Sequence, residues 1–384
     1  MTDLSLTFEP RALAPQQEKL RDDIRAFLKD EHDRGTFARA QEAMAKHDFG
    51  FSERLGAAGF IGMTWPEEFG GKGLTFLDRY VVTEELMAAG APCGAHWVAD
   101  RQSGPLLIRY GTPEQRARFL PEIIAGKSYF CIGMSEPDSG SDLASIRTTA
   151  KKVDGGWLVN GTKLWTSNAH ICHYMIALVR TEPPSDDRHA GMSQMLIDLN
   201  SDGIDIQPVK NLAGHHHFNQ EMFTDCFVPD DMVVGTVGNG WEQVMSELAY
   251  ERSGPERFLS TFQMLVELVR AVGPDPSEIE ARAIGRLTSH LMTLRNMALT
   301  VAGQLTDGEL PATEAALVKD LSTNFCKEIP EVARLVYPPD AGAGDNMKYE
   351  EALATATLYA PSFTIQGGTR EILRGMIARG LGLR

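Results

Sequence analysis

Residues 131–142, CIGMSEPDSGSD, decide how the rest of this sequence is interpreted. The β-prone run YFCI at 129–132 leads into a loop that is dense in small and hydrogen-bonding residues. Glycine and serine let a backbone approach a flat or phosphorylated ligand, and their N–H and O–H groups can bond to polar edges. The same residues are typical of an ordinary turn, so the loop needs support from the rest of the chain.

Helical patterns precede this loop. The segments EKLRDDIRAFLKDEH, RYVVTEELMAAG and TPEQRARFLPEIIAG carry apolar residues at helical spacing. Thr112 is a predicted N-cap, with Pro113 at the first helical position of the third segment. We therefore expect a helical N-terminal domain over residues 1–126.

The spacing of apolar residues changes to two after the loop begins. Residues 127–235 contain ASIRTTAKKV, WLVNGTKLW, MIALVR, MSQMLIDL, IDIQPV and QEMFTDCFVP, separated by short polar turns. Strands linked without intervening helices favour an antiparallel barrel or sandwich. From residue 236 helical spacing returns, beginning with WEQVMSELAYERSGPERFLSTFQMLVELVR, and long amphipathic helices with short loops predict a C-terminal bundle over 236–384.

Charge and composition exclude some classes of protein. The 384 residues carry a formal net charge of -15, which argues against nucleic-acid binding through bulk electrostatics but not against a phosphorylated small molecule. Neither a basic segment followed by an apolar one at the N-terminus nor a run of 18 apolar residues occurs, so no signal peptide or membrane span is expected. The five cysteines form no CxxC pair, which is typical of free thiols in a reducing compartment such as the cytoplasm.

Familiar nucleotide-binding and hydrolase signatures are missing. The sequence has no GxGxxG between a strand and a helix, no GxxxxGK[ST], no HExxH and no GxSxG. The triplet His215, His216 and His217 is the one apparent metal candidate. No carboxylate-rich or cysteine-rich set near it completes a coordination sphere, so a polar loop is the favoured interpretation.

Three segments in order, CIGMSEPDSGSDLASIRT, NGTKLWTSNAH and IQGGTREILRGMIARGLGL, resemble the acyl-CoA dehydrogenase family. The family pattern TEPxAGSD is present as SEPDSGSD, W(I/T)(S/T)NA as WTSNA, and the terminal GGTxEIxRxxIAR nearly unchanged. The resemblance covers essentially the whole chain. It implies an α+β fold with a helical N-terminal domain, a central antiparallel β-barrel and a C-terminal four-helix bundle. It also implies that FAD binds between the β-barrel and the C-terminal bundle.

The resemblance also implies which residues meet the cofactor. Seven residues of the central domain are expected to line the flavin and the adjoining thioester path: Ile132, Met134, Ser135, Gly140, Ser141, Trp165 and Ser167. Thr369 and Glu371 are expected to approach the FAD from the C-terminal segment. An indole packs well on an isoalloxazine, although plain core packing is an alternative for Trp165.

The implied reaction is α,β-dehydrogenation of an acyl-CoA thioester, which needs a well-placed carboxylate base and a stabilised enolate oxygen. In much of the family the base is a Glu just before the Gly-Thr of the terminal motif, but Gly367 stands there and retains only an N–H for the thioester oxygen. Isovaleryl and long-chain types carry the base in a Glu-Arg pair early in the C-terminal bundle. Glu251-Arg252 matches that pair, so Glu251 is the expected base and Arg252 a supporting residue. A solvated helical glutamate is the alternative.

Two departures from the family bear on partners. The family's Arg-x-x-Phe-Gly and Gln-x-x-Gly-Gly segments, which reach the FAD of a neighbouring subunit, are replaced by AVGPDPSEIE and YPPDAGAGDN. Such losses resemble the subunits of heterotetrameric steroid side-chain dehydrogenases. We therefore expect a homo-oligomer or an α2β2 heterotetramer with a second acyl-CoA dehydrogenase-like chain, a bulky, steroid-type substrate, and an electron-transferring flavoprotein as acceptor. The alternatives are a non-catalytic subunit that completes a partner's FAD site, and a flavin monooxygenase or nitroalkane oxidase on the same fold.

Overall fold

The computed structural model describes residues 6–183, 185–248, 253–339 and 346–383. The chain forms two compact units. One, the helical unit, contains Met1–Met44, Thr75–Pro92 and Ala249–Arg384, and the other, the sheet unit, contains Ala45–Leu74 and Cys93–Leu248. The expected Glu251 and Arg252 lie outside the described residues. Within the described residues, no helix is both long enough and apolar enough to span a bilayer.

One sheet dominates the sheet unit. Its strands are β1 (Phe130–Gly133), β2 (Thr149–Val153), β3 (Gly156–Ser167), β4 (Tyr174–Arg180), β5 (Met192–Asp198), β6 (Ile204–Lys210), β7 (His216–Pro229) and β8 (Val233–Val234). They are ordered β6-β7-β3-β2-β4-β5-β8, and β1 pairs with β4. The β1–β4 and β2–β4 pairs are parallel, whereas the other pairs are antiparallel.

The order of helical domain, central β domain and helical bundle is confirmed, but the described strands of the expected antiparallel barrel form an open, mixed sheet. Its edges are β6 and β8. Gln115 of α5 (Pro113–Ile124) donates to the carbonyls of Asp231 and Val233 at 2.7 and 2.8 Å, so a helix side chain satisfies backbone groups beside the β8 edge. A barrel would instead need strand pairing there.

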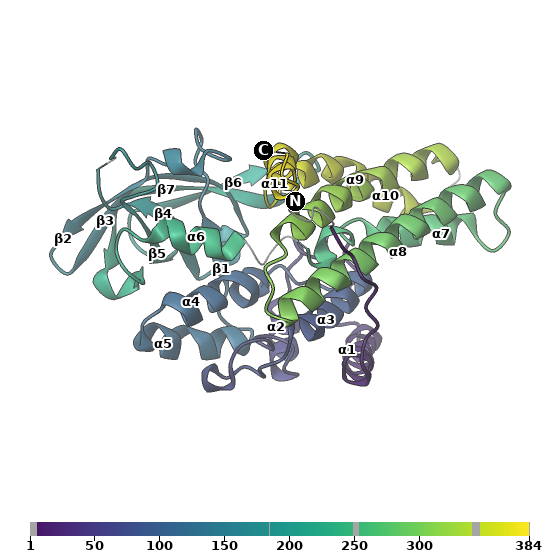
Figure 1. The fold of residues 1–384 in the computed structure, drawn as a ribbon, viewed down its shortest axis with the longest axis horizontal. Helices are drawn as coiled ribbons and strands as arrows, with labels where there is room; N and C mark the ends of the chain where they lie inside the picture. Colours follow the sequence, from purple (N-terminus) through teal and green to yellow (C-terminus); the bar gives the residue numbers. More distant parts are fainter. Residues whose placement is uncertain (1–5, 184, 249–252, 340–345, 384) are drawn as a thin grey trace. The chain divides into compact units, whose positions relative to one another are not determined.

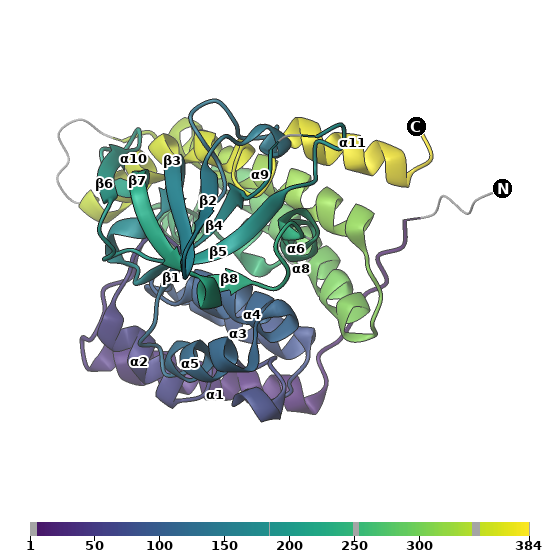
Figure 2. The ribbon, with the colours of Figure 1, turned by 90° about the vertical axis from the view of Figure 1, so that its left-hand side faces the viewer.

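Helices cover this sheet. Its unit also contains α2 (Phe49–Ala57), α4 (Gly104–Tyr110) and α6 (Gly240–Leu248), and Figure 2 shows α4 and α5 beside one another near β1 and β8. The predicted N-cap of α5 is confirmed, since Thr112 Oγ1 accepts from the Gln115 N–H at 3.2 Å. Strands β4 and β5 are almost wholly buried, as the continuous apolar run of β4 requires.

Packed helices build the helical unit. They are α1 (Pro15–Asp33), α3 (Phe76–Ala89), α7 (Phe262–Val272), α8 (Glu278–Thr306), α9 (Ala312–Val336), α10 (Met347–Tyr359) and α11 (Arg370–Gly380). Helices α7 to α10 form the expected four-helix bundle, and Figure 1 shows the long α8 and α9 side by side. Glu84 of α3 accepts from Arg295 of α8 at 2.7 and 3.0 Å, which ties an early helix to the bundle.

The helical pattern over 241–270 does not form one helix. Helix α6 is described as Gly240–Leu248 within the sheet unit, and α7 starts at Phe262 within the helical unit. Between them Gly254 precedes a short 3-10 turn, Pro255–Arg257. Proline restricts the residue before it to extended conformations, and Gly254 has φ -71° and ψ 162°, so the helical spacing is interrupted locally.

Candidate functional site

Glu136 holds the loop that follows β1. Its carboxylate is 7% exposed and accepts from the N–H groups of Arg147 and Thr148 at 2.6 and 2.9 Å and from Lys163 Nζ at 2.9 Å. Lys163, on β3, is wholly buried and also donates to the carbonyl of Met134 at 3.1 Å. The loop is thus anchored to the sheet by a buried ion pair.

Electrostatics at this pair are set by burial. Burial lowers the pKa of Lys163 to about 8, although the neighbouring Glu136 carboxylate opposes the shift. Burial would raise the pKa of Glu136, but the Lys163 charge and the bonds from Thr148, Lys163 and Arg147 outweigh it and hold that pKa below its ordinary value. Sequence reasoning assigned neither residue a role, because charged side chains are rarely buried unless they are paired, and the sequence does not show this pair.

A second buried acid, Glu221 of β7, lies across from β3. Its Oε2 accepts from Thr166 Oγ1 at 2.7 Å, and its side chain is wholly buried. Burial raises the pKa of Glu221 to about 7, while the Thr166 hydroxyl, a backbone bond and the Lys163 charge oppose the shift. Glu221 therefore binds a proton more tightly in the folded chain than in the unfolded one.

Replacing Glu221 by Gln should change how stability depends on pH. Between pH 4.5 and 7 the folded wild type retains a proton that the unfolded chain releases, so its free energy of unfolding falls as pH rises. The free energy of unfolding of the wild type, minus that of Glu221→Gln, should therefore fall by about 3 kcal/mol across that window, at 1.36 kcal/mol per pKa unit. Urea unfolding of both proteins at pH 4.5 to 7.5 measures it. A difference that stays constant with pH would contradict the assignment.

Trp165 adopts an unusual backbone conformation. Its φ is 67°, in the left-handed region that bulky residues rarely enter, and it lies where the β3–β7 register shifts between Leu164 and Thr166. Such strain costs about 1–3 kcal/mol and is concentrated at functional sites. Trp165 is 55% exposed, and its indole and the Phe218 ring meet edge to face, with centroids 5.8 Å apart. The described surroundings do not bury this indole in a core.

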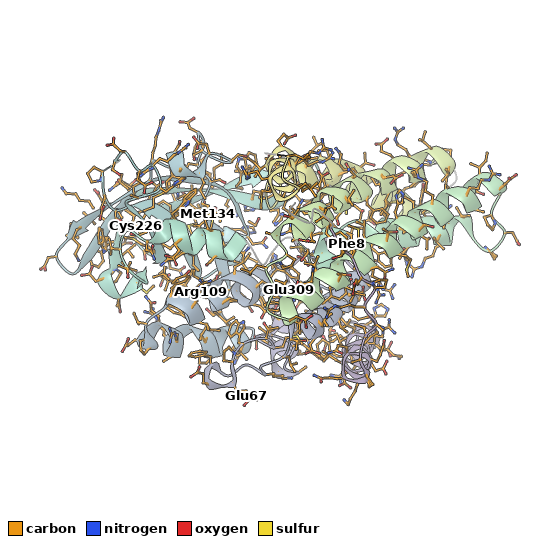
Figure 3. All side chains as sticks on the ribbon, viewed as in Figure 1. Phe8, Glu67, Arg109, Met134, Cys226 and Glu309 are labelled. Carbon is orange, nitrogen blue, oxygen red and sulfur yellow. The ribbon has the colours of Figure 1, made fainter. Side chains whose placement is uncertain are left out.

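The other expected cofactor residues of the sheet unit differ in setting. Met134, labelled in Figure 3, packs on a buried cluster that includes Leu178 of β4 and Val244 of α6, so part of its side chain contributes to core packing. The Ser135 carbonyl accepts from the Leu164 N–H at 2.9 Å, which brings the loop next to Trp165. The remaining members lie on β1, in the loop and at the end of β3: Ile132, Gly140, Ser141 and Ser167.

Gly140 is open to solvent, and a Cβ added there would meet no atom within 4 Å. Beside it Ser139 Oγ donates to the carbonyl of Asp142 at 2.6 Å, which closes the loop. An exposed indole and an uncrowded glycine on one unit are features that a flat, phosphorylated cofactor can use.

Expected site residues of the helical unit surround the start of α11. Thr369 is its N-cap and accepts from the Ile372 N–H at 3.4 Å. Glu371 lies in the first turn, where bonds to its own backbone N–H and to Thr369 lower its pKa. Gly367 has φ 70°, and a Cβ added there would lie 3.1 Å from Arg257 Nη1. The Arg257 side chain is 8% exposed, and its Nε lies 3.6 Å from Glu256 Oε1.

One member of the histidine triplet, His216, contacts an asparagine together with His170. His216 Nε2 and His170 Nδ1 lie 2.7 and 3.1 Å from Asn219 Oδ1, and the two rings stack with centroids 3.8 Å apart. His217 is mostly buried, and burial lowers its pKa to about 4. In the part of the chain that the structure describes, no three His, Cys, Asp or Glu side chains gather as metal ligands. Asn219 was missed because an amide in a strand gives no sequence signal.

Comparisons with known proteins agree along the chain. The models for the acyl-CoA dehydrogenase N-terminal, middle and C-terminal domains match residues 14–127, 131–226 and 277–382. Acyl-CoA dehydrogenase IpdE1 of Mycobacterium tuberculosis is 36% identical over 343 residues, 87% of each chain. The ChsE4-ChsE5 complex from Mycobacterium tuberculosis has a chain of 27% identity and TM-score 0.82, covering 98% of this chain and 100% of that one. A chain of the Tcur3481-Tcur3483 steroid ACAD has TM-score 0.85 at 24% identity, covering 98% and 99%.

A helical first part, a central sheet with the SEPDSGSD loop and a terminal helical bundle define an oxidoreductase that acts on acyl-CoA. The chain belongs to the acyl-CoA dehydrogenase family. FAD is its cofactor, as in the family, and the exposed Trp165 indole and open Gly140 fit a planar, phosphorylated group.

Proposed function

We propose that this chain catalyses α,β-dehydrogenation of a bulky, steroid-type acyl-CoA, within an assembly that includes a second, unlike acyl-CoA dehydrogenase-like chain. The observation that carries the proposal is Gly367, which has no carboxylate at the family's usual base position, in a chain similar to a subunit of the ChsE4-ChsE5 complex. The name of the Tcur3481-Tcur3483 steroid ACAD supports the substrate class. The cytoplasm is the proposed compartment, in keeping with five free cysteines.

Each proposed residue has a chemical task. Glu251 removes the α proton, and an apolar acyl cavity around it would raise its pKa toward the working pH, as a general base requires. The Gly367 N–H holds the thioester oxygen, which stabilises the enolate charge that develops there. Arg252 supports the substrate beside the base.

The proposed cofactor contacts are those that the family motifs imply. Trp165 and Ser167 lie on one side of the flavin, and the loop residues Ile132, Met134, Ser135, Gly140 and Ser141 line its other side and the thioester path. Thr369 and Glu371 approach the FAD from the start of α11. Bound FAD supplies the acceptor for the hydride lost from the β carbon, and an electron-transferring flavoprotein is the proposed final acceptor.

Replacing Gly367 by Glu should fail to restore a base. In a Glu251→Gln background, turnover of Gly367→Glu should stay within about twofold of the single variant. Gly367 has φ 70°, and its new Cβ would displace the Arg257 guanidinium at 3.1 Å. That cation would also lower the pKa of the new carboxylate, the opposite of what a base at this site needs. Steady-state assays measure turnover, and a Gly367→Ala variant in the same background separates the effect of backbone strain from that of charge. A rise in turnover of more than tenfold for Gly367→Glu would contradict the assignment of Glu251 as the base.

A non-catalytic subunit that completes a partner's FAD site is the second candidate. The replaced Arg-x-x-Phe-Gly and Gln-x-x-Gly-Gly segments favour it, whereas the retained SEPDSGSD and WTSNAH segments favour a chain with its own flavin face. A flavin monooxygenase or nitroalkane oxidase on the same fold would instead use O2 productively.

Flavin stoichiometry and acceptor choice test these proposals together. The chain is purified alone and with the product of its genomic neighbour, and FAD per subunit is measured. We expect fewer flavins than subunits in the co-purified assembly, and steroid-type acyl-CoA should reduce a dye acceptor without O2. One FAD per subunit in a homotetramer would overturn the heteromer, and turnover that requires O2 would overturn the dehydrogenase.

A further inference from the structure

Groups of the residues on both sides of Trp165 are held by side chains or by the SEPDSGSD loop. Before it, the Leu164 N–H donates to the Ser135 carbonyl at 2.9 Å. After it, the Thr166 carbonyl accepts from Asn219 Nδ2 at 3.0 Å, and the Thr166 hydroxyl donates to Glu221 at 2.7 Å. A left-handed residue persists only when its surroundings determine it, and these three bonds are adjacent to the strained position.

Asn219 is the centre of this arrangement. Its side chain is wholly buried, and its amide nitrogen faces the Thr166 carbonyl, so the amide oxygen must face the two imidazoles. His170 therefore donates from Nδ1 and His216 from Nε2. Each ring nitrogen that contacts Asn219 also carries hydrogen in a protonated imidazole, so the bonds do not depend on one protonation state.

We propose that Asn219, oriented by His170 and His216, is a positioning residue that fixes the Thr166 carbonyl and thereby presents the Trp165 indole toward the flavin. The proposal rests on the proposed contact between Trp165 and FAD. It assigns a task to His216, one member of the histidine triplet, that neither metal binding nor the dehydrogenation chemistry uses. The amide acts through Thr166 and the backbone, and it does not itself touch a reacting atom.

Asn219→Asp is the first test, because it keeps the size of the side chain and an acceptor for both imidazoles but replaces the donor to Thr166 with an oxygen. Binding of FAD to the assembly is measured by flavin fluorescence. Exposure of Trp165 is measured without FAD by acrylamide quenching of tryptophan fluorescence. The chain has five tryptophans, so the signal of the Trp165→Phe variant is subtracted to isolate that of Trp165. We expect the FAD Kd to rise about tenfold, which is about 1.4 kcal/mol, and the quenching constant of Trp165 to change about twofold.

Two matched substitutions at His216 test the same arrangement with Asn219 unchanged, and they remain informative if Asn219→Asp does not fold. His216→Gln keeps an N–H at the position of Nε2 and should bind FAD within twofold of wild type. His216→Phe keeps a ring for the stack on His170 but removes the donor, and it should raise the FAD Kd about fivefold.

Each result decides the proposal. Equal effects of His216→Gln and His216→Phe would overturn it, as would a folded Asn219→Asp variant with unchanged FAD binding and unchanged Trp165 quenching. FAD binding by His216→Gln that stays near that of the wild type, together with the expected change in Trp165 quenching in Asn219→Asp, supports the proposal. Failure of the wild-type assembly to bind FAD would instead contradict the proposed function, so the two failures are distinguishable.

Discussion

Replacing Glu251 by Gln is expected to lower kcat by about 10²- to 10⁴-fold, the range that a positioned general base contributes. Gln matches Glu in size but cannot take the α proton, so substrate binding and FAD content should be retained. The family's usual base position is Gly367, which carries no side chain to replace the lost carboxylate. Anaerobic dye reduction by the complete assembly measures kcat and KM separately.

Glu242→Gln is the matched control for this experiment. Glu242 is exposed in the first turn of α6, where its Oε2 accepts from Asn239 Nδ2 at 3.0 Å, and no catalytic task is proposed for it. Its kcat should equal that of the wild type. Turnover retained by Glu251→Gln would remove Glu251 as the base and favour the non-catalytic subunit.

The second large effect is expected on stability. Lys163→Met should lower the free energy of unfolding by about 3–5 kcal/mol, because it leaves the buried Glu136 carboxylate without its counter-charge. Two backbone N–H bonds remain on that carboxylate, from Arg147 and Thr148, so the lower end of the range is expected. Urea unfolding of the variant without FAD measures the change, which isolates the fold from cofactor binding.

Lys152→Met provides the comparison. Lys152 of β2 pairs with Asp230, in the 3-10 turn after β7. The two side chains are 52% and 53% exposed, so loss of this pair should cost less than about 1 kcal/mol. Similar losses in the two lysine variants would show that the buried pair at Glu136 does not anchor the loop.

Local patterns predicted the helices well and the sheet only partly. The N-cap at Thr112 depends on residues three apart, so the sequence shows it directly. Closure of a sheet depends on which distant strands pair, and no local pattern gives the parallel pairing of Phe130 with Tyr174. The predicted helix after Gly240 is interrupted near Pro255, because proline restricts the residue before it to extended conformations.

Sequence reasoning identified the family motifs but not the residues that hold them in place. It selected Trp165, but its left-handed backbone arises from a β-bulge opposite β7, which no motif encodes. Lys163 follows Thr162 and Glu221 follows Gln220 in their strands, and only strand pairing shows that both face a buried interior. Glu251 remains a prediction, because it lies outside the described residues.

The bond between Glu84 and Arg295 has a consequence for biosynthesis. Its partners are 211 positions apart, so at about 5–20 residues per second a ribosome needs roughly 10–40 s to make the second after the first. During that interval α1 and α3 have left the ribosome without α8, and α3 carries apolar residues that are buried in the finished protein. Nascent chains that stop before α8 should therefore depend on chaperones and aggregate when released early.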